Sequence, residues 1–278
     1  MSKMKFPVLE VFTSIQGEGV YTGVPSVFVR VAGCNLRCVF GNSRCDTPYS
    51  SFELEKPIAS TVDEAISLVA AELEKYPNVR HLVITGGEPM LYKEAIKKFY
   101  EELTLDWGLE LTIETNGSLP ALEMWDGEDT GYDTMFWVDL WSVSPKLSTS
   151  VDKQCKYLTE KQAKDHDEKR INIKNLASYM RDHINVHRED ITGAKIQFKF
   201  VYSGEESVKE IQDIVEKVAE ELDVSVNYVN EHVLLMPEGT TNDQLNNIAQ
   251  ECAEVCIREG WQFCDRLHIR IWGDKRGV

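Results

Sequence analysis

Three cysteines lie close enough together in the sequence to share one metal centre. Cys34, Cys38 and Cys45 follow a short apolar segment, and Thr85-Gly86-Gly87-Glu88-Pro89 comes further along the chain. An iron–sulfur cluster of the cubane type normally takes four thiolates, so three local thiolates would leave one iron open to a substrate or cofactor. The spacing therefore favours an iron–sulfur centre with a catalytic role.

Zinc and unligated thiols are the competing interpretations of these cysteines. Structural zinc usually takes two close ligand pairs, or a fourth Cys or His at short spacing. The next histidine, His81, falls on an apparently buried strand. The odd total of seven cysteines suits metal ligation in a reducing compartment better than a disulfide framework. The pattern favours iron–sulfur over zinc and leaves free thiols open.

Two glycine-rich segments are candidates for holding a small molecule. Gly86 and Gly87 stand between a predicted strand and a predicted helix, where the backbone can approach a ligand, and Glu88 could pair with an ammonium group. The other segment, 16–19, lacks the spacing of a dinucleotide fingerprint, yet Gln16 and Glu18 could read the edge of a nitrogen heterocycle. A tight turn and a plain hairpin connection are the structural alternatives.

A histidine near the carboxyl end of the chain is a further candidate. His268 lies beside Arg266 and Arg270 and alternates with Ile269 and Ile271, a pattern that predicts a short strand. Both a site residue and a structurally satisfied histidine fit this pattern.

Hydrophobic patterns predict strands and helices that alternate along the chain. Helices are expected over 93–103 and after capping boxes that begin at Thr61, Ser207 and Thr241. Strands are expected at 8–14, 26–32, 81–85, 109–114, 136–143, 195–202, 233–236 and 267–272. This order favours an α/β fold with a parallel sheet, either an open barrel fragment or a doubly wound sheet, and places site residues at strand carboxyl ends.

Length and composition suit one catalytic domain that spans residues 1–278. The chain is 42% hydrophobic and 27% charged, enough for a sizeable core. The stretch at about 148–193 is polar and contains a run of charged residues, so we expect a polar, solvated helical insertion there.

The charge of the chain bears on its partners. A formal net charge of −16 disfavours binding to nucleic acid or anionic membranes, because both carry negative charge. No segment resembles a signal peptide or reaches the roughly 20 apolar residues of a membrane span. We therefore expect a cytoplasmic protein that acts on a small molecule.

Taken together, these segments resemble the radical S-adenosylmethionine (SAM) superfamily and, within it, the 7-carboxy-7-deazaguanine synthase (QueE) family. The resemblance runs nearly end to end. It rests on the segments 14–19, 28–34, 45–47, 86–89, 114–117, 144–147, 236–239 and 268–278.

The resemblance implies a partial (β/α) barrel of the radical SAM type, a homodimer, and the following site residues. A [4Fe-4S] cluster would bind Cys34, Cys38 and Cys45, and Mg²⁺ would bind Thr47. SAM would contact Gly86, Gly87, Glu88, Ser144 and Lys146. The pterin substrate would contact Gln16, Glu18, Arg30 and His268.

The implied activity is that of a carbon–nitrogen lyase in 7-deazapurine (queuosine) biosynthesis. Reductive cleavage of SAM gives a 5′-deoxyadenosyl radical, which takes hydrogen from C6 of 6-carboxy-5,6,7,8-tetrahydropterin. Ring contraction with loss of ammonia then gives 7-carboxy-7-deazaguanine, and SAM is expected to be regenerated. The chemistry belongs to the cofactors, while the protein fixes geometry and excludes water. An electron donor such as flavodoxin is implied as a partner.

The cysteine spacing departs from the family pattern. Six residues separate Cys38 from Cys45 instead of the usual two, and Arg44 replaces the usual aromatic residue. We expect a bulge there that the fold tolerates. Another radical SAM enzyme, such as a glycyl-radical activase, and a non-catalytic metal-binding protein are the alternatives. Gln16 and Glu18 weigh against the first, and Thr47, Lys146 and His268 against the second.

Overall fold

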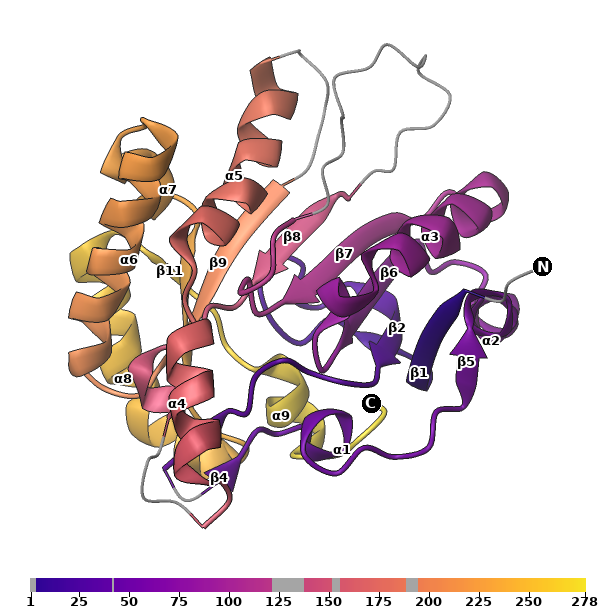
Figure 1. Ribbon diagram of the computed structural model, residues 1–278, viewed down its shortest axis with the longest axis horizontal. Coiled ribbons are helices and arrows are strands. Elements are labelled where there is room, and N and C mark those ends of the chain that lie inside the picture. Colours follow the sequence, from indigo (N-terminus) through magenta and orange to yellow (C-terminus); the bar gives the residue numbers. More distant parts are fainter. Residues whose placement is uncertain (1–3, 42, 122–137, 152–155, 189–194) are drawn as a thin grey trace.

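A parallel sheet forms the centre of the computed structural model, which describes residues 4–41, 43–121, 138–151, 156–188 and 195–278 (Figure 1). The sheet has nine strands in the order β11-β10-β9-β8-β7-β6-β2-β1-β5. These are β1 (Lys5–Ile15), β2 (Pro25–Val31), β5 (Ala59–Thr61), β6 (His81–Gly86), β7 (Glu110–Thr115), β8 (Leu140–Val143), β9 (Lys195–Tyr202), β10 (Val233–Pro237) and β11 (Gln262–Phe263). All neighbours from β2 to β11 pair in parallel, and β1 and β5 add antiparallel strands at one edge.

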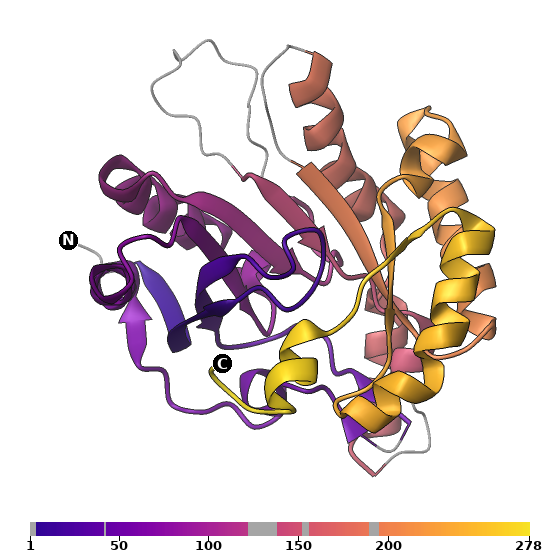
Figure 2. The ribbon, with the colours of Figure 1, turned by 180° about the vertical axis from the view of Figure 1, so that it is seen from behind.

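Helices follow most of the parallel strands and pack against the sheet, as the two opposite views show (Figures 1 and 2). The α-helices are α1 (Pro48–Ser51), α2 (Val62–Lys75), α3 (Lys93–Trp107), α4 (Glu160–Lys169), α5 (Ile173–Arg188), α6 (Glu206–Leu222), α7 (Val226–Asn230), α8 (Asn242–Glu259) and α9 (Leu267–Trp272). The 3₁₀ segments are η1 (Pro89–Tyr92) and η3 (Ser148–Ser150). Within the described ranges, no helix is long and apolar enough to cross a membrane.

The two faces of the sheet carry different side chains. Successive residues of a strand point to opposite faces. In β2, Val27, Val29 and Val31 are fully buried in the core that the helices cover. Ser26, which precedes Val27 and points to the opposite face, contacts His81 on the neighbouring strand β6, with 2.7 Å between Oγ and Nδ1. The helix-covered face is therefore apolar, and the opposite face is partly polar.

The predicted α/β fold with a parallel sheet is confirmed, and the barrel is open because β5 and β11 are opposite ends of the strand order. The predicted strands at 8–14, 26–32, 81–85, 109–114, 195–202 and 233–236 are all present with small shifts of their ends. The strand predicted at 136–143 begins in residues outside the described ranges, and its described part is β8.

Two local predictions are wrong. The segment 267–272 is not a strand but the helix α9. Six residues are too few to establish a period of 2 or of 3.6, and the helix separates the two isoleucines, with Ile269 buried and Ile271 exposed. Ser207 does not cap a helix, since α6 begins at Glu206 and Ser207 lies buried inside its first turn. Gly204, at φ +149°, turns the chain early enough for this start.

The stretch expected to be a solvated insertion contains two helices of different character. In α4 most side chains are polar and only Ala163 and His166 are buried. In α5, by contrast, Leu176, Tyr179 and Met180 are buried at helical spacing and join the main core. The helix α5 therefore packs on the sheet, and the solvated character is limited to α4.

Candidate active site

One large cavity lies at the carboxyl ends of the parallel strands. Its volume is about 890 Å³. Every site residue predicted from the sequence lines it except Glu88; the lining set includes Gln16, Glu18, Arg30, Cys34, Cys38, Cys45, Thr47, Gly86, Gly87, Ser144, Lys146 and His268. Residues as far apart in the sequence as Gln16 and His268 thus share one space, as expected for this edge of a parallel sheet.

The long spacing between the second and third cysteines is taken up by a small hairpin. Strands β3 (Val39–Phe40) and β4 (Ser43–Arg44) pair in antiparallel fashion. At the base of this hairpin the backbone N–H of Cys45 donates to the carbonyl of Cys38 at 3.0 Å. The hairpin therefore returns Cys45 to the side of Cys38, and its residues Phe40, Ser43 and Arg44 line the large cavity.

The three thiols surround a second cavity of about 20 Å³, which Gly86 and Gly87 also line. No three Cys, His, Asp or Glu side chains in the described ranges meet closely enough to hold a single metal ion. Burial raises the pKa of Cys34 to about 12 and also raises those of Cys38 and Cys45. Metal binding would have to release these protons. Three thiols spread around a cavity are a donor set that fits an iron–sulfur cluster.

Glu88 does not face the cavity. Its side chain is fully buried and caps the 3₁₀ turn η1, with Oε1 accepting from the Met90 N–H at 2.9 Å. The same oxygen accepts from Thr115 Oγ1 at 2.7 Å, and Oε2 accepts from the Asn116 N–H at 2.8 Å. Burial raises the pKa of Glu88. The carboxylate that we expected to face a ligand therefore lies beneath the turn, and the backbone of Gly86 and Gly87 faces the cavity.

Asn116 connects the buried carboxylate of Glu88 to the first cysteine. Its Nδ2 donates to Asn35 Oδ1 at 3.0 Å and lies 3.9 Å from the sulfur of Cys34. Asn35 in turn donates to Ser118 Oγ at 2.7 Å. The glycine turn and the cysteine segment are thus held together by side chains from the end of β7.

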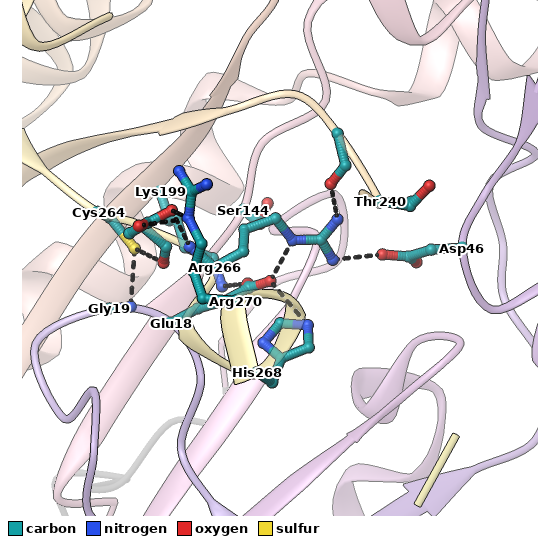
Figure 3. A network of polar contacts seen from close by, with 12 residues as sticks. Glu18, Gly19, Asp46, Ser144, Lys199, Thr240, Cys264, Arg266, His268 and Arg270 are labelled. Atoms are coloured by element: carbon teal, nitrogen blue, oxygen red, sulfur yellow. Dashed lines mark hydrogen bonds and ion pairs between the residues drawn. The ribbon is translucent and has the colours of Figure 1, made fainter. Parts of the chain in front are cut away.

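Glu18 is held between two cations in the cavity (Figure 3). Its Oε2 accepts from Lys199 Nζ at 2.5 Å, and its Oε1 accepts from Arg266 Nε at 2.9 Å. Burial opposes ionisation, but the two cations hold the pKa of Glu18 well below its usual range. His268 Nε2 lies 4.0 Å from the same carboxylate. Glu18 is therefore an ionised group that accepts hydrogen bonds and donates none.

Arg266 joins three segments around this carboxylate. Besides Glu18, its guanidinium donates to the Gly239 carbonyl at 2.7 Å and to Asp46 Oδ2 at 2.8 Å (Figure 3). Only 9% of Arg266 is exposed. The glycine-rich loop after β1, the loop after β10 and the cysteine segment thus meet at one side chain. Arg266 stands two positions before His268 in the sequence, and no motif there indicated this role.

Lys199 was missed, although the sequence carried a signal for it. Gln197 and Lys199 alternate with the core residues Ile196, Phe198 and Phe200 in β9. Two polar side chains at a period of 2 in an apolar strand indicate a polar face. Gln197 bonds to Ser142 Oγ at 2.7 Å on that face, and Lys199 bonds to Glu18.

Gly17, the first glycine of the loop at 16–19, permits the side chain of His268 to approach the loop backbone closely. A Cβ atom on Gly17 would lie 2.0 Å from Nδ1 of His268. The Gly17 carbonyl accepts from the Leu267 N–H at 2.8 Å, which fixes the start of α9. Glycine at this position therefore lets the imidazole of His268 pack directly on the loop. Burial lowers the pKa of His268 in spite of the nearby Glu18.

Gln16 and Arg30 present groups that are partly engaged by neighbours. Gln16 Nε2 donates to Glu114 Oε1 at 3.0 Å, and its Oε1 accepts from the Glu18 N–H at 3.3 Å. Arg30 donates through Nε to Glu10 Oε2 at 2.7 Å. Among the residues that the structure describes, neither Nη atom of Arg30 has a hydrogen-bond partner. Arg30 can therefore offer these two nitrogens to an anion in the cavity.

Three further polar groups line the cavity near the cysteines. Lys146 Nζ donates to Ser144 Oγ at 2.9 Å in the loop after β8. Thr47 precedes α1, but its hydroxyl makes no capping bond to that helix and lies 3.5 Å from the sulfur of Cys45. These groups can contact anionic or metal-bound oxygen atoms.

The sequence is similar to a known protein family and to proteins of known name. A family model described as the radical SAM superfamily matches residues 28–156. The 7-carboxy-7-deazaguanine synthase of Halobacterium salinarum is 34% identical over 271 residues, which cover 96% of this chain and 91% of that protein. The synthase of the same name from Rhodopirellula baltica is 34% identical over 278 residues, which cover 100% and 90% of the two chains.

A solved structure shares the fold. The crystal structure of QueE from Escherichia coli superposes with a TM-score of 0.55 at 20% sequence identity and covers 95% of each chain. The partial barrel predicted from the sequence is confirmed by this likeness.

Proposed function

The chain belongs to the 7-carboxy-7-deazaguanine synthase family of radical SAM enzymes, and on this basis we propose that it converts 6-carboxy-5,6,7,8-tetrahydropterin to 7-carboxy-7-deazaguanine and ammonia. The observation that carries the proposal is the shared cavity. Three thiols, a glycine turn, an ionised carboxylate and an arginine with open donors face the same space. Such a space can hold a redox cofactor beside a nitrogen heterocycle that carries a carboxylate.

Cys34, Cys38 and Cys45 are the proposed ligands of a [4Fe-4S] cluster. When bound there with SAM, the cluster would supply one-electron reductive chemistry. The backbone of Gly86 and Gly87 would face the amino-acid part of SAM, with Glu88 fixing their turn from below. Ser144 and Lys146 would contact the nucleoside or the carboxylate of SAM from the loop after β8.

The pterin is proposed to bind between β1, β2 and α9. Arg30 suits the 6-carboxylate because its two Nη groups can donate to both oxygens. Glu18 is held ionised, so it suits the N–H groups of the pyrimidine ring as an acceptor, and Gln16 offers both a donor and an acceptor. His268 packs at the side of this loop and would limit the width of the pocket.

We propose that Thr47 would hold Mg²⁺, which would supply a hard cation for the carboxylate of the substrate. A hard cation takes oxygen ligands and often keeps several waters, so one protein hydroxyl can suffice. The position of Thr47 in the cavity wall, with a hydroxyl that makes no capping bond to α1, supports this assignment.

The proposed reaction balances without an external oxidant. The product and ammonia together contain the atoms of the substrate, so hydrogen taken from C6 has to be returned within the cycle. The role of the chain is to orient the pterin and to keep water away from reactive species. Consistent with that role, apolar residues such as Phe12, Phe28, Met236 and Ile248 form part of the cavity wall.

We further propose a homodimer that receives electrons from a separate donor such as flavodoxin. The family resemblance alone supports both statements. Light scattering of the purified protein would test the first, and the reduction of the reconstituted cluster by flavodoxin would test the second.

Ligand discrimination tests the proposed substrate. Reconstituted protein with SAM and Mg²⁺, but without reductant, is titrated by calorimetry with 6-carboxy- and with 6-methyl-5,6,7,8-tetrahydropterin. We expect the carboxylated compound to bind about 30-fold more tightly, the effect of charged hydrogen bonds to Arg30. Arg30→Gln should abolish the preference, while Glu10 keeps its contacts with Tyr49 and Arg276.

Arg80→Gln is the matched control, because Arg80 is exposed and donates to the backbone carbonyls of Pro77 and Val79 in its own loop. It should retain the preference. Equal binding of the two pterins by the unmodified protein would refute the proposed substrate and favour another radical SAM reaction.

A further inference from the structure

The cysteine turn, residues 34–38, is held by side chains and not by regular secondary structure. Arg37 folds back so that Nη1 donates to the carbonyls of Cys34 at 2.7 Å and Leu36 at 2.8 Å. Its backbone N–H donates to Nδ1 of His166 at 2.9 Å. The turn therefore depends on a histidine that lies 129 residues further along the chain.

His166 has a single hydrogen-bonding arrangement open to it. Ser150 Oγ donates its only hydrogen to the Leu147 carbonyl at 2.6 Å, so it accepts from Nε2 of His166 at 3.0 Å. Nε2 therefore carries the proton and Nδ1 is the acceptor for Arg37. The residue is 2% exposed, and burial together with Arg170 lowers its pKa to about 4. His166 is neutral at physiological pH and uses both ring nitrogens.

The same helix also fixes the loop that carries Ser144 and Lys146. Arg170, at the end of α4, donates through Nη1 to the Lys146 carbonyl at 3.1 Å and to Glu210 at 2.5 Å. Glu210 accepts from the N–H and the hydroxyl of Ser148 at 2.9 and 2.7 Å. Through Leu147 and Ser150, His166 contacts this loop as well.

We infer that α4 is a brace that sets the distance between the cysteine turn and the loop 144–150, and that His166 is its central positioning residue. This inference rests on the proposed function, in which the first segment binds the cluster and the second binds SAM. Neither nitrogen of His166 faces the cavity, and its role is to act through Arg37 and Ser150. The polar stretch between β8 and α5 would thus serve cofactor geometry.

Two variants separate the two arms of the brace. His166→Asn keeps an acceptor near the position of Nδ1 but does not reach Ser150, whereas His166→Gln keeps a donor near Nε2 and loses the acceptor for Arg37. In metal-free protein, the alkylation rates of Cys34 and Cys38 are followed by mass spectrometry, with buried Cys252 on α8 as internal standard. In reconstituted protein, KM for SAM, kcat and the change in the electron paramagnetic resonance spectrum on SAM addition are measured.

We expect His166→Gln to raise the alkylation rates of Cys34 and Cys38 about fivefold relative to Cys252 and to weaken the SAM-dependent spectral change. His166→Asn should leave the alkylation rates near those of the unmodified protein but raise KM for SAM about tenfold with a smaller effect on kcat. Lys164→Gln is the control, since this side chain is 76% exposed and pairs with Glu168 on the same helix. It should change none of these quantities.

Unchanged alkylation rates and SAM parameters in both histidine variants would overturn the inference. A uniform rise at Cys34, Cys38 and Cys252 would also overturn it, because that result indicates general loosening. If His166→Gln fails to fold, Ser150→Ala removes the Nε2 partner and should raise KM for SAM alone. Failure of the proposed function is distinguishable, since it would appear as SAM cleavage without 7-carboxy-7-deazaguanine in the unmodified protein.

Discussion

At the scale of single residues, the cavity is organised around buried charges that are paired. An isolated carboxylate in this position would be strongly disfavoured, and Lys199 and Arg266 offset that cost for Glu18. Arg266 also pairs with Asp46, which is flanked by Cys45 and Thr47. The guanidinium of Arg266 thus links Glu18, which is proposed to bind the pterin, to the segment that carries the proposed metal ligands Cys45 and Thr47.

Replacing Arg266 tests this link. Arg266→Gln removes the ion-pair partner of Asp46 and one of the two cations that donate to Glu18. We expect a loss of about 3 kcal/mol in the free energy of unfolding, typical of a broken buried ion pair, and a decrease of at least tenfold in kcat/KM for the pterin. Urea titration and steady-state kinetics measure the two quantities.

Arg258→Gln provides the control for the same substitution. Arg258 pairs with Glu205 across an exposed surface, where the two side chains are 49% and 60% exposed, and such pairs contribute little. It should leave stability and kinetics unchanged. Equal effects of the two substitutions would refute the special role of Arg266.

His81 makes stability depend on pH. It lies between Ser26 and Thr112, with 2.7 Å from each ring nitrogen to the adjacent hydroxyl, and burial lowers its pKa to about 4. Unfolded histidine titrates near pH 6.5, so between pH 6.5 and 4 the unfolded state binds more protons and stability falls as the pH falls. The expected contribution between pH 7.5 and 5 is about 2 kcal/mol.

His81→Gln should remove that contribution. Urea unfolding of the metal-free protein gives its free energy of unfolding at pH 7.5 and at pH 5. The decrease in this free energy between the two pH values should be about 2 kcal/mol smaller in the variant than in the unmodified chain. Both pH values lie above 4.5, below which protonation of Glu18 in the unfolded state also begins to lower the stability of the fold. An identical loss in both proteins would contradict the assignment.

At the scale of elements, the turn after β6 has to pack against the cysteine segment. A Cβ atom on Gly87 would lie 2.0 Å from the carbonyl oxygen of Gly33 and 2.8 Å from that of Ser50. Both are backbone atoms, which cannot move aside as a flexible side chain can. The glycine turn, the end of β2 and α1 therefore form one rigid contact behind the proposed cluster.

Gly87→Ala should break that contact. We expect a loss of about 3 kcal/mol in the free energy of unfolding and loss of SAM binding, because the turn has to move away from the cavity wall. Gly260→Ala is the comparison, since Gly260 ends α8 at φ +75° with open space around it and should cost only about 1 kcal/mol. Similar stability and SAM affinity in both variants would contradict this packing.

The order of strands and helices could be predicted because each long element has a clear period. Helix α9 could not, since six residues do not define a period, and its position depends on the contact between Leu267 and Gly17. The hairpin β3–β4 was expected only as a bulge. It shows how the sequence departs from the family spacing and still returns Cys45 to Cys38.

The residues that line the cavity could be predicted from the sequence more readily than the contacts that their side chains make. Motifs located the cysteines, the glycine turn and Glu18, and these all line the cavity except Glu88. The direction of the Glu88 side chain depends on Asn116 and Thr115, which belong to another strand end. The contact of His166 with Arg37 likewise depends on where α4 packs, and no local pattern encodes it.

At the scale of the whole molecule, charge is distributed unevenly between the surface and the site. The chain carries a formal net charge of −16, yet the residues that line the cavity include seven lysines and arginines against five aspartates and glutamates. Cations gathered in a cleft favour small anionic ligands, while the acidic remainder disfavours polyanions. This distribution suits a substrate and a cofactor that each carry a carboxylate.

The most direct test of the proposed function is product formation. Reconstituted protein is incubated without oxygen with dithionite, SAM, Mg²⁺ and 6-carboxy-5,6,7,8-tetrahydropterin, and 7-carboxy-7-deazaguanine is measured by mass spectrometry beside Cys45→Ala and Cys256→Ala. We expect product from the unmodified protein and from Cys256→Ala, whose thiol is buried on α8, and none from Cys45→Ala. SAM cleavage without this product in the unmodified protein, or product from Cys45→Ala, would contradict the proposed function and its site.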